Sequence, residues 1–158
     1  MGIEKLYEAL DMAWERDDHK ELIDIYSKLI RDWEPNQPLH YSGLATVQLF
    51  DGDVDGAADT LEYLDNNIEM QSKDARQDRD LAYGYLYAER ANRCFSGVDY
   101  EQGIEYRYPN RDEEVDCAEQ WLEKARQVHL RDEYLKGQIK TVSSVISAYR
   151  KQLKKRVF

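Results

Sequence analysis

The residue types best suited to chemistry form a run of carboxylates between positions 51 and 62. The acidic members of this run are Asp51, Asp53, Asp55, Asp59 and Glu62. Gly56 lies among them at the position where a tight loop needs a sharp turn. Oxygen ligands at these spacings are typical of a 12-residue calcium-binding loop. Calcium binding by residues 51–62 is therefore one hypothesis for this chain.

The same segment also has the apolar spacing of a helix. A helix that begins near Val54 would turn Asp55, Asp59 and Glu62 onto one outer face instead of around an ion. In addition, no second loop of this kind accompanies it, and Ala58 stands where such loops normally carry a β-branched residue. An EF-hand-like calcium-binding protein is therefore the alternative interpretation of residues 51–62, and a helix is the main one.

Signals for catalysis are weak. The sequence has no Gly-x-Ser-x-Gly elbow, no glycine-rich phosphate loop and no His-Glu-x-x-His helix. The histidines His19, His40 and His129 are scattered, and each lacks a second metal ligand at helical or turn spacing beyond the abundant acids. We predict no enzymatic activity, no cofactor and no resident metal ion.

A segment at about 96–112 is rich in tyrosine and arginine and interrupts the helical pattern. Its candidate contact residues are Tyr100, Tyr106, Arg107, Tyr108 and Arg111. Tyrosine and arginine are enriched in protein interfaces, and loops of this length are often functional. Two interpretations stay open: the segment binds a partner, or it folds over a neighbouring helix pair and shields it.

Apolar residues recur at spacings of three and four, the pattern of amphipathic helices. Helices are predicted at residues 3–15, 22–33, 39–50, 54–66, 81–95, 113–128 and from 132 onward. Pro35 ends the second of them, because proline cannot continue a helix. The polar residues 66–80 are predicted to be a connector or the exposed start of the fifth helix.

Pairs of these helices repeat with an offset of 35 residues. The offset relates Asp17 to Gly52, Leu22 to Ala57, Tyr26 to Leu61, and Leu29 to Leu64. Ala118, Leu122 and Ala125 return with the same spacing. A fixed period of this length is the signature of a helical repeat array. We predict an all-α fold in a single domain over residues 1–158, with about three antiparallel helix hairpins and a C-terminal capping helix.

One stretch of this pattern resembles a tetratricopeptide repeat (TPR). The matching residues are Leu44, Ala45, Gly52, Asp53, Val54, Gly56, Ala57, Ala58, Leu61 and Leu64. Residues 4–34 resemble a second copy, with Asp17 in place of the usual glycine, and residues 81–130 a third, with the tyrosine-rich segment inserted. The resemblance implies a right-handed array with a concave groove that binds a peptide or protein segment.

By the same resemblance, the first helix of each pair lines the groove. The implied residues are Glu4, Tyr7, Asp11, Trp14 and Glu15, then Leu39, Ser42, Thr46, Leu49 and Phe50, and finally Tyr85, Glu89, Asn92 and Arg93. Family members that clamp a terminal carboxylate have basic residues and asparagine where this chain has Tyr7 and Asp11, so such a clamp is not expected. The aromatic members could instead simply pack between helices.

The distribution of charge narrows the class of partner. The net charge is −10, and residues 1–80 hold 20 acidic residues against 8 basic ones, whereas residues 131–158 hold 2 against 8. An acidic body repels phosphate backbones and disfavours nucleic acid. We predict a non-catalytic protein-interaction module for a basic or amphipathic segment. A third hypothesis is an acidic decoy or immunity-type inhibitor that covers a basic surface by charge.

The start of the chain and its cysteines bear on location. Met-Gly-Ile-Glu-Lys-Leu is not a signal-peptide pattern, and no apolar run reaches the roughly 18 residues that span a bilayer. We predict a cytoplasmic protein that does not enter the membrane. Cys94 and Cys117 do not have Cys-x-x-Cys spacing, which predicts two buried, reduced thiols.

Overall fold

A computed structural model describes residues 2–70, 72–96, 98–99, 104–105, 111–128 and 132–156. Its regular elements are helices apart from two strands of two residues each, so the all-α fold class is confirmed. It divides into two compact units, Met1–Ala82 and Tyr83–Phe158, and we describe each by itself. The expectation of a single repeat domain stays a prediction.

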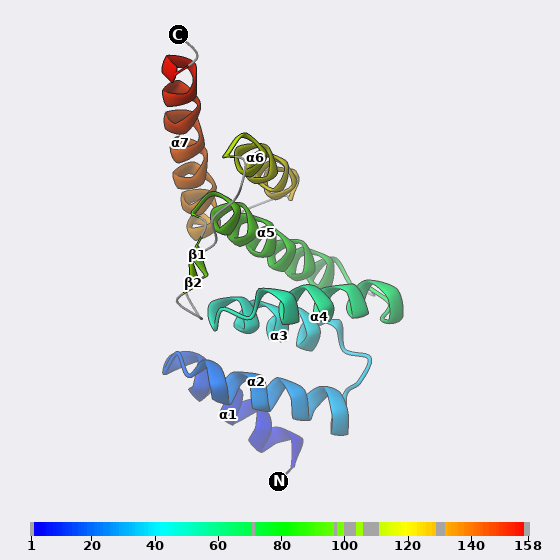
Figure 1. Ribbon diagram of the computed structural model, residues 1–158. Helices are drawn as coiled ribbons and strands as arrows, with labels where there is room; N and C mark the ends of the chain where they lie inside the picture. Colours follow the sequence, from blue (N-terminus) through cyan, green and yellow to red (C-terminus); the bar gives the residue numbers. More distant parts are fainter. Residues whose placement is uncertain are drawn as a thin grey trace. The chain divides into compact units, whose positions relative to one another are not determined.

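The first unit contains four helices and the beginning of a fifth (Figure 1). These are α1 (Ile3–Glu15), α2 (His19–Lys28) with its π-helical extension η1 (Leu29–Trp33), α3 (Pro38–Phe50), α4 (Val54–Asn67) and α5 (Lys73–Ser96). In chain order, α1 packs on α2, α2 on α3, and α3 on α4. The predicted helices agree with these bounds to within a few residues, except that α5 begins well before residue 81. Of the two interpretations of residues 66–80, the early helix start is correct from Lys73.

The turns inside the first two helix pairs have the same construction, 35 residues apart. Asp17 and Gly52 both have left-handed backbone, with φ of 55° and 87°. The next residues, Asp18 and Asp53, cap α2 and α4 by accepting a hydrogen bond from the backbone N–H three positions later, at 3.2 and 2.9 Å. Aspartate is a favoured N-cap because it satisfies an N–H that has no partner within the helix. The sequence period is therefore a structural period in both turns.

The core of the first unit follows the same period. Five pairs of positions related by 35 residues are buried: Leu6 and Tyr41, Leu10 and Ala45, Leu22 and Ala57, Tyr26 and Leu61, and Leu29 and Leu64. At two of these pairs, alanine in the second copy (Ala45 and Ala57) stands where the first copy has leucine. Burial of apolar surface at these positions is what holds the helices together.

The two left-handed turn residues predict opposite effects on stability. Only glycine adopts positive φ without a steric cost, which for other residues is about 1 kcal/mol. Asp17→Gly is therefore expected to raise the free energy of unfolding by up to about 1 kcal/mol, and Gly52→Ala to lower it by about the same amount. Urea unfolding of the wild type and of both variants measures the two changes in the free energy of unfolding. Changes of the same sign would contradict this account of the turns.

The second unit contains the rest of α5, a short hairpin and two further helices (Figure 1). Strands β1 (Val98–Asp99) and β2 (Ile104–Glu105) pair antiparallel, and helices α6 (Arg111–Gln127) and α7 (Glu133–Arg156) follow. The core contains Ala91, Val115, Ala118, Leu122, Val142 and Ile146. The segment at about 96–112 was predicted to be an inserted loop, and its described residues include these two short strands.

Candidate functional site

The first unit has a pocket of about 370 Å³. Its lining residues are Tyr7, Leu10 and Trp14 of α1, Tyr26 of α2, Gln37, then Leu39, His40, Ser42, Gly43 and Thr46 of α3, and Asp78 and Leu81 at the start of α5. Five of the groove residues implied by the TPR resemblance therefore lie together here: Tyr7, Trp14, Leu39, Ser42 and Thr46. Tyr26, His40 and Asp78 belong to the same pocket and were missed.

Four rings form a continuous aromatic lining. The centroid of Tyr26 lies 6.4 Å from that of Trp14, edge to face, and 6.3 Å from that of His40. Tyr7 continues the series, with its centroid 5.9 Å from that of His40. The indole Nε1–H of Trp14 donates a 3.0 Å hydrogen bond to the Tyr26 hydroxyl. This bond fixes the orientation of both rings in the pocket.

The backbone of α3 leaves room for the Tyr26 ring. A Cβ atom at Gly43 would lie only 2.5 Å from Cζ and 2.6 Å from the hydroxyl oxygen of Tyr26. Glycine inside a helix normally weakens it by about 0.5–1 kcal/mol relative to alanine. At position 43 glycine is needed because the nearly buried Tyr26 ring packs directly against the α3 backbone and occupies the space of the missing side chain.

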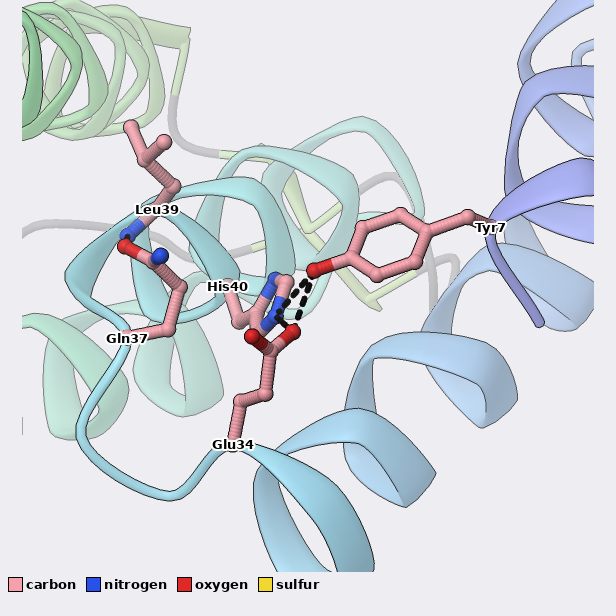
Figure 2. A network of polar contacts seen from close by, with 5 residues as sticks. All are labelled: Tyr7, Glu34, Gln37, Leu39 and His40. Atoms are coloured by element: carbon pink, nitrogen blue, oxygen red, sulfur yellow. Dashed lines mark hydrogen bonds and ion pairs between the residues drawn. The ribbon is translucent and has the colours of Figure 1, made fainter. Parts of the chain in front are cut away.

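A polar network joins two residues of the pocket lining, Tyr7 and His40, to Glu34 (Figure 2). The Tyr7 hydroxyl donates to Oε1 of Glu34. The same oxygen lies 3.0 Å from Nε2 of His40, and that nitrogen is 3.2 Å from the Tyr7 hydroxyl. Because an ionised carboxylate can only accept, His40 donates to it through Nε2–H. His40 is 4% exposed, so the network ties a buried ring of α3 to α1 and to the end of η1.

The π-helical turn η1 positions Glu34 for this network. The backbone N–H of Glu34 donates to the carbonyl of Leu29 at 2.7 Å, a bond that spans five residues instead of four. The wider turn ends directly before Pro35, where the chain must leave the helix. Single π-turns of this kind are common at functional sites. Apolar spacing predicted the helix here, but not this wider final turn.

The network shifts the pKa of both acidic groups. The pKa of Tyr7 is raised to about 12, first because its hydroxyl is partly withdrawn from water and then because it donates to Glu34. The pKa of Glu34 is lowered, mainly because Tyr7 donates to the carboxylate and next because His40 does. Both shifts favour neutral Tyr7 beside ionised Glu34 in the folded state.

These shifts predict how the contribution of Tyr7 to stability depends on pH. A lowered pKa of Glu34 contributes stability above its unfolded value of about 4.3, and a raised pKa of Tyr7 contributes stability below about 10. The loss of stability in Tyr7→Phe is therefore expected to be largest between these limits. It should shrink as pH falls through the folded pKa of Glu34 and as pH rises from about 10 to about 12.

Urea unfolding of the wild type and Tyr7→Phe across the pH range measures this difference. The matched control is the same pair of proteins in a Glu34→Gln background, which should lose the decrease at acid pH. A difference between wild type and Tyr7→Phe that stays constant from acid to alkaline pH would contradict the network.

Two carboxylates lie beside the aromatic lining. Asp78 lines the pocket, and its pKa is raised, first by burial and then by the nearby charge of Asp74. Burial raises the pKa of Tyr26, and the negative charges of Asp78 and Asp11 raise it further, while the bond from Trp14 opposes the shift. Among the residues that the structure describes, neither Asp78 nor Asp11 forms a hydrogen bond or an ion pair through its side chain. The pocket therefore combines aromatic rings with the carboxylate of Asp78, which lacks a basic partner within the described part of the chain, and the exposed Asp11 adds a second negative charge outside the lining.

Several implied groove residues of the first unit lie away from this pocket. Glu4 and Glu15 are exposed on α1 outside the pocket lining. Leu49 is 8% exposed and belongs to the core, which corrects its assignment to an open groove. The ring of Phe50, the last residue of α3, lies 5.9 Å from that of His19, the first residue of α2. The expectation that these residues contact a partner stays a prediction for all except Leu49.

The third implied set lies in the second unit. Glu89 and Asn92 line a separate pocket of about 510 Å³ with residues of α7. Tyr85 is nearly buried and donates a hydrogen bond to Asp132. Arg93 pairs with Glu89 at 3.3 Å. Of the candidate contact residues in the tyrosine-rich segment, Tyr100, Tyr106, Arg107 and Tyr108 lie outside the described residues, and so does the side chain of Arg111.

The calcium-loop alternative is incompatible with the structure of residues 51–62. Helix α4 already begins at Val54, whereas a calcium loop needs an irregular backbone over most of its 12 residues. Asp55 and Asp59 are exposed and one helical turn apart. Across the described residues, which include all of 51–62, no three His, Cys, Asp or Glu side chains are arranged to hold a metal ion. The five predicted ligands, Asp51, Asp53, Asp55, Asp59 and Glu62, are therefore not brought together.

Comparisons with known proteins leave the geometry as the basis for assigning function. No protein-family model, curated protein or solved structure matches this chain. Within the described ranges, no helix is both long and apolar enough to cross a bilayer. Any functional conclusion must therefore come from the pocket and its charges.

Proposed function

We propose that the first unit is a protein-interaction module that binds a basic segment of another protein and holds a lysine or arginine side chain in the aromatic pocket. The observation that carries this proposal is the placement of Asp78 beside the lining formed by Tyr7, Trp14 and Tyr26. A cation attracted by a carboxylate and by aromatic faces is the ligand that such a site favours.

The energetics support a cationic ligand. Contact between a cation and an aromatic face contributes about 0.5–1 kcal/mol at an exposed site and about 2 kcal/mol when water is excluded. Asp78 is exposed as a residue, but partial burial of its carboxyl group and the nearby charge of Asp74 raise its pKa, and an incoming cation would favour its charged form. The long methylene stem of lysine or arginine would meanwhile pack against the rings.

The net negative charge of the first unit also favours a basic partner, because it attracts such a partner from beyond contact distance. Residues 1–82 hold 20 acidic and 8 basic residues, a net charge of −12, whereas the rest of the chain has a net charge of +2. A strongly acidic surface accelerates encounter with a basic partner and repels nucleic acid. Specificity then depends on the pocket, because charge alone does not distinguish one basic surface from another.

We propose that α1 with α2 and α3 with α4 are two TPR-like hairpins. The matched left-handed turns, aspartate caps and buried positions support this assignment. In such an array the first helix of each pair faces the ligand, and α1 and α3 supply most of the pocket lining. A cytoplasmic, non-catalytic adaptor is the role that fits this arrangement.

Titration with a fluorescently labelled oligolysine peptide tests the proposal. The Asp78→Asn change is expected to weaken binding roughly fivefold, because one charge close to the ligand is worth about 1 kcal/mol. Trp14→Phe keeps an apolar ring in place but provides a weaker cation site, and should weaken binding by a smaller factor. Asp59→Asn removes the same charge from an exposed residue of α4 that does not line the pocket, and serves as the matched control, with little expected effect.

An acidic decoy is the second candidate function, and the net charge of −12 over residues 1–82 is the observation that favours it. A decoy binds by charge density, so Asp78→Asn and Asp59→Asn should then weaken binding equally. Its affinity should also fall steeply with salt, because exposed charges are screened. Pocket binding predicts instead unequal effects of the two changes and a part of the affinity that persists at high salt.

A further inference from the structure

The two cysteines of the chain meet in the second unit. Cys94 of α5 and Cys117 of α6 have their sulfur atoms 2.8 Å apart, and both are thiols in the structure. A disulfide bond is about 2.05 Å long, so a small rotation of the two side chains would bring the sulfurs to bonding distance. Nothing in the sequence spacing of the pair indicates this contact.

The surrounding packing holds the two sulfurs together. Cys94 packs against the core cluster, one helical turn after the fully buried Ala91, and Cys117 directly precedes the fully buried Ala118. The ring of Tyr87 on α5 stacks on that of Trp121 on α6, with centroids 5.2 Å apart. The two helices therefore touch at two successive places, the ring stack and the cysteine pair.

The pair is also within reach of a reagent. Both cysteines are only partly buried, unlike the neighbouring alanines, which are completely buried. The sequence predicted buried, reduced thiols, and partial exposure corrects the expectation of burial. A solvent-accessible thiol next to a second thiol is the arrangement found at sites of reversible oxidation.

We propose that Cys94 and Cys117 are a site of reversible oxidation, at which a small-molecule disulfide such as oxidised glutathione converts the two thiols into a disulfide between α5 and α6. One cysteine loses its proton, and its thiolate attacks the glutathione disulfide, which forms a mixed disulfide and releases one glutathione thiolate. The thiolate of the other cysteine then attacks the protein sulfur of that mixed disulfide. The second glutathione thiolate leaves, and the two released thiolates take up the two protons that the cysteines lost.

The new bond would change the stability of the second unit. It would close a loop that contains the whole segment 95–116 and would add a covalent link between α5 and α6. A cross-link over a loop of this size is expected to raise the melting temperature on the order of 10 °C, mainly by restricting the unfolded chain. Reduction by excess glutathione would reverse the change.

The test exposes the intact, folded chain to a series of ratios of oxidised to reduced glutathione, followed by acid quenching and intact-mass measurement. The expected product is a monomer that has lost two hydrogen atoms and that no longer reacts with an alkylating reagent. Proteolysis should yield a peptide in which Cys94 is linked to Cys117. Each of Cys94→Ser and Cys117→Ser should stop at the mixed disulfide, with one glutathionyl group attached.

The same series in concentrated urea is the control for the fold. If the helices hold the sulfurs together, the disulfide should form at a ratio of oxidised to reduced glutathione at least about tenfold lower in the folded chain. Three results would overturn the proposal: two thiols that stay open to alkylation under oxidising conditions, glutathione retained on both cysteines, or disulfide-linked dimers in place of the internal bond.

Discussion

Replacing Leu22 with alanine is expected to lower the free energy of unfolding by about 3 to 4 kcal/mol. Leu22 of α2 has no exposed surface and lies in the core cluster of the first unit with Leu6, Leu10 and Leu29. The deletion removes buried apolar atoms and leaves a cavity that the surrounding helices fill only in part. Urea unfolding followed by tryptophan fluorescence measures the loss, and hydrogen exchange should show it in α1 and α2.

Met12→Ala is the matched control for this change. Met12 is a similarly large apolar side chain on α1, but it is 55% exposed, so its truncation should cost less than about 0.5 kcal/mol. Similar losses in the two variants would mean that Leu22 does not belong to the core described here. They would also remove the basis for placing α1 and α2 as the walls of the pocket.

The second large effect is expected at Gly43, where alanine should destabilise the protein by about 1 to 2 kcal/mol. Helix propensity alone predicts the opposite sign, a gain of about 0.5–1 kcal/mol. The clash decides the outcome, because the added Cβ would lie 2.5 Å from the Tyr26 ring. The ring is nearly buried and held by Trp14, so it cannot move without losing that hydrogen bond.

A double-mutant cycle separates this clash from a general effect on α3. Tyr26→Leu removes the ring atoms that collide with the new Cβ, so Gly43→Ala should be much less harmful in the Tyr26→Leu background. Gly43→Ala alone should also weaken oligolysine binding, because the displaced ring narrows the pocket. Additive losses of stability in the cycle would contradict the close approach of α3 and Tyr26.

The sequence predicted the helices well because their apolar spacing is a local property. The similarity of the two turns was also predictable, because the 35-residue offset aligns Asp17 with Gly52, and both residues have a left-handed backbone. The start of α5 was uncertain because residues 66–80 are polar, and helix propensity there had no apolar stripe to confirm it. The hairpin of β1 and β2 was missed because two-residue strands have no measurable period.

The pocket was predicted only in part, for a physical reason. The TPR resemblance pointed to one face of α1 and α3, which contains Tyr7, Trp14 and Thr46. Tyr26 and Asp78 join the pocket through tertiary packing of other helices, and no local spacing signals that contact. Helical spacing placed Tyr26 in the core, and it is indeed nearly buried, yet its ring also lines the pocket.

His40 and the cysteine pair were missed for related reasons. His40 seemed isolated because its partner Glu34 reaches it only through the π-helical turn at the end of α2. Cys94 and Cys117 belong to different helices, and only the packing of α5 against α6 brings their sulfurs together. Contacts of this kind depend on the angle between helices, which hydrophobic period does not determine.

The most direct measurement is NMR of the intact chain, labelled with isotopes and titrated with an unlabelled oligolysine peptide. The proposed function predicts intermolecular nuclear Overhauser effects between lysine methylene protons and the ring protons of Trp14 and Tyr26, with a shift of the Trp14 indole N–H. Small shifts spread over the exposed acids of α4, with no such effects at the pocket rings, would contradict binding in the pocket and favour attraction by charge alone.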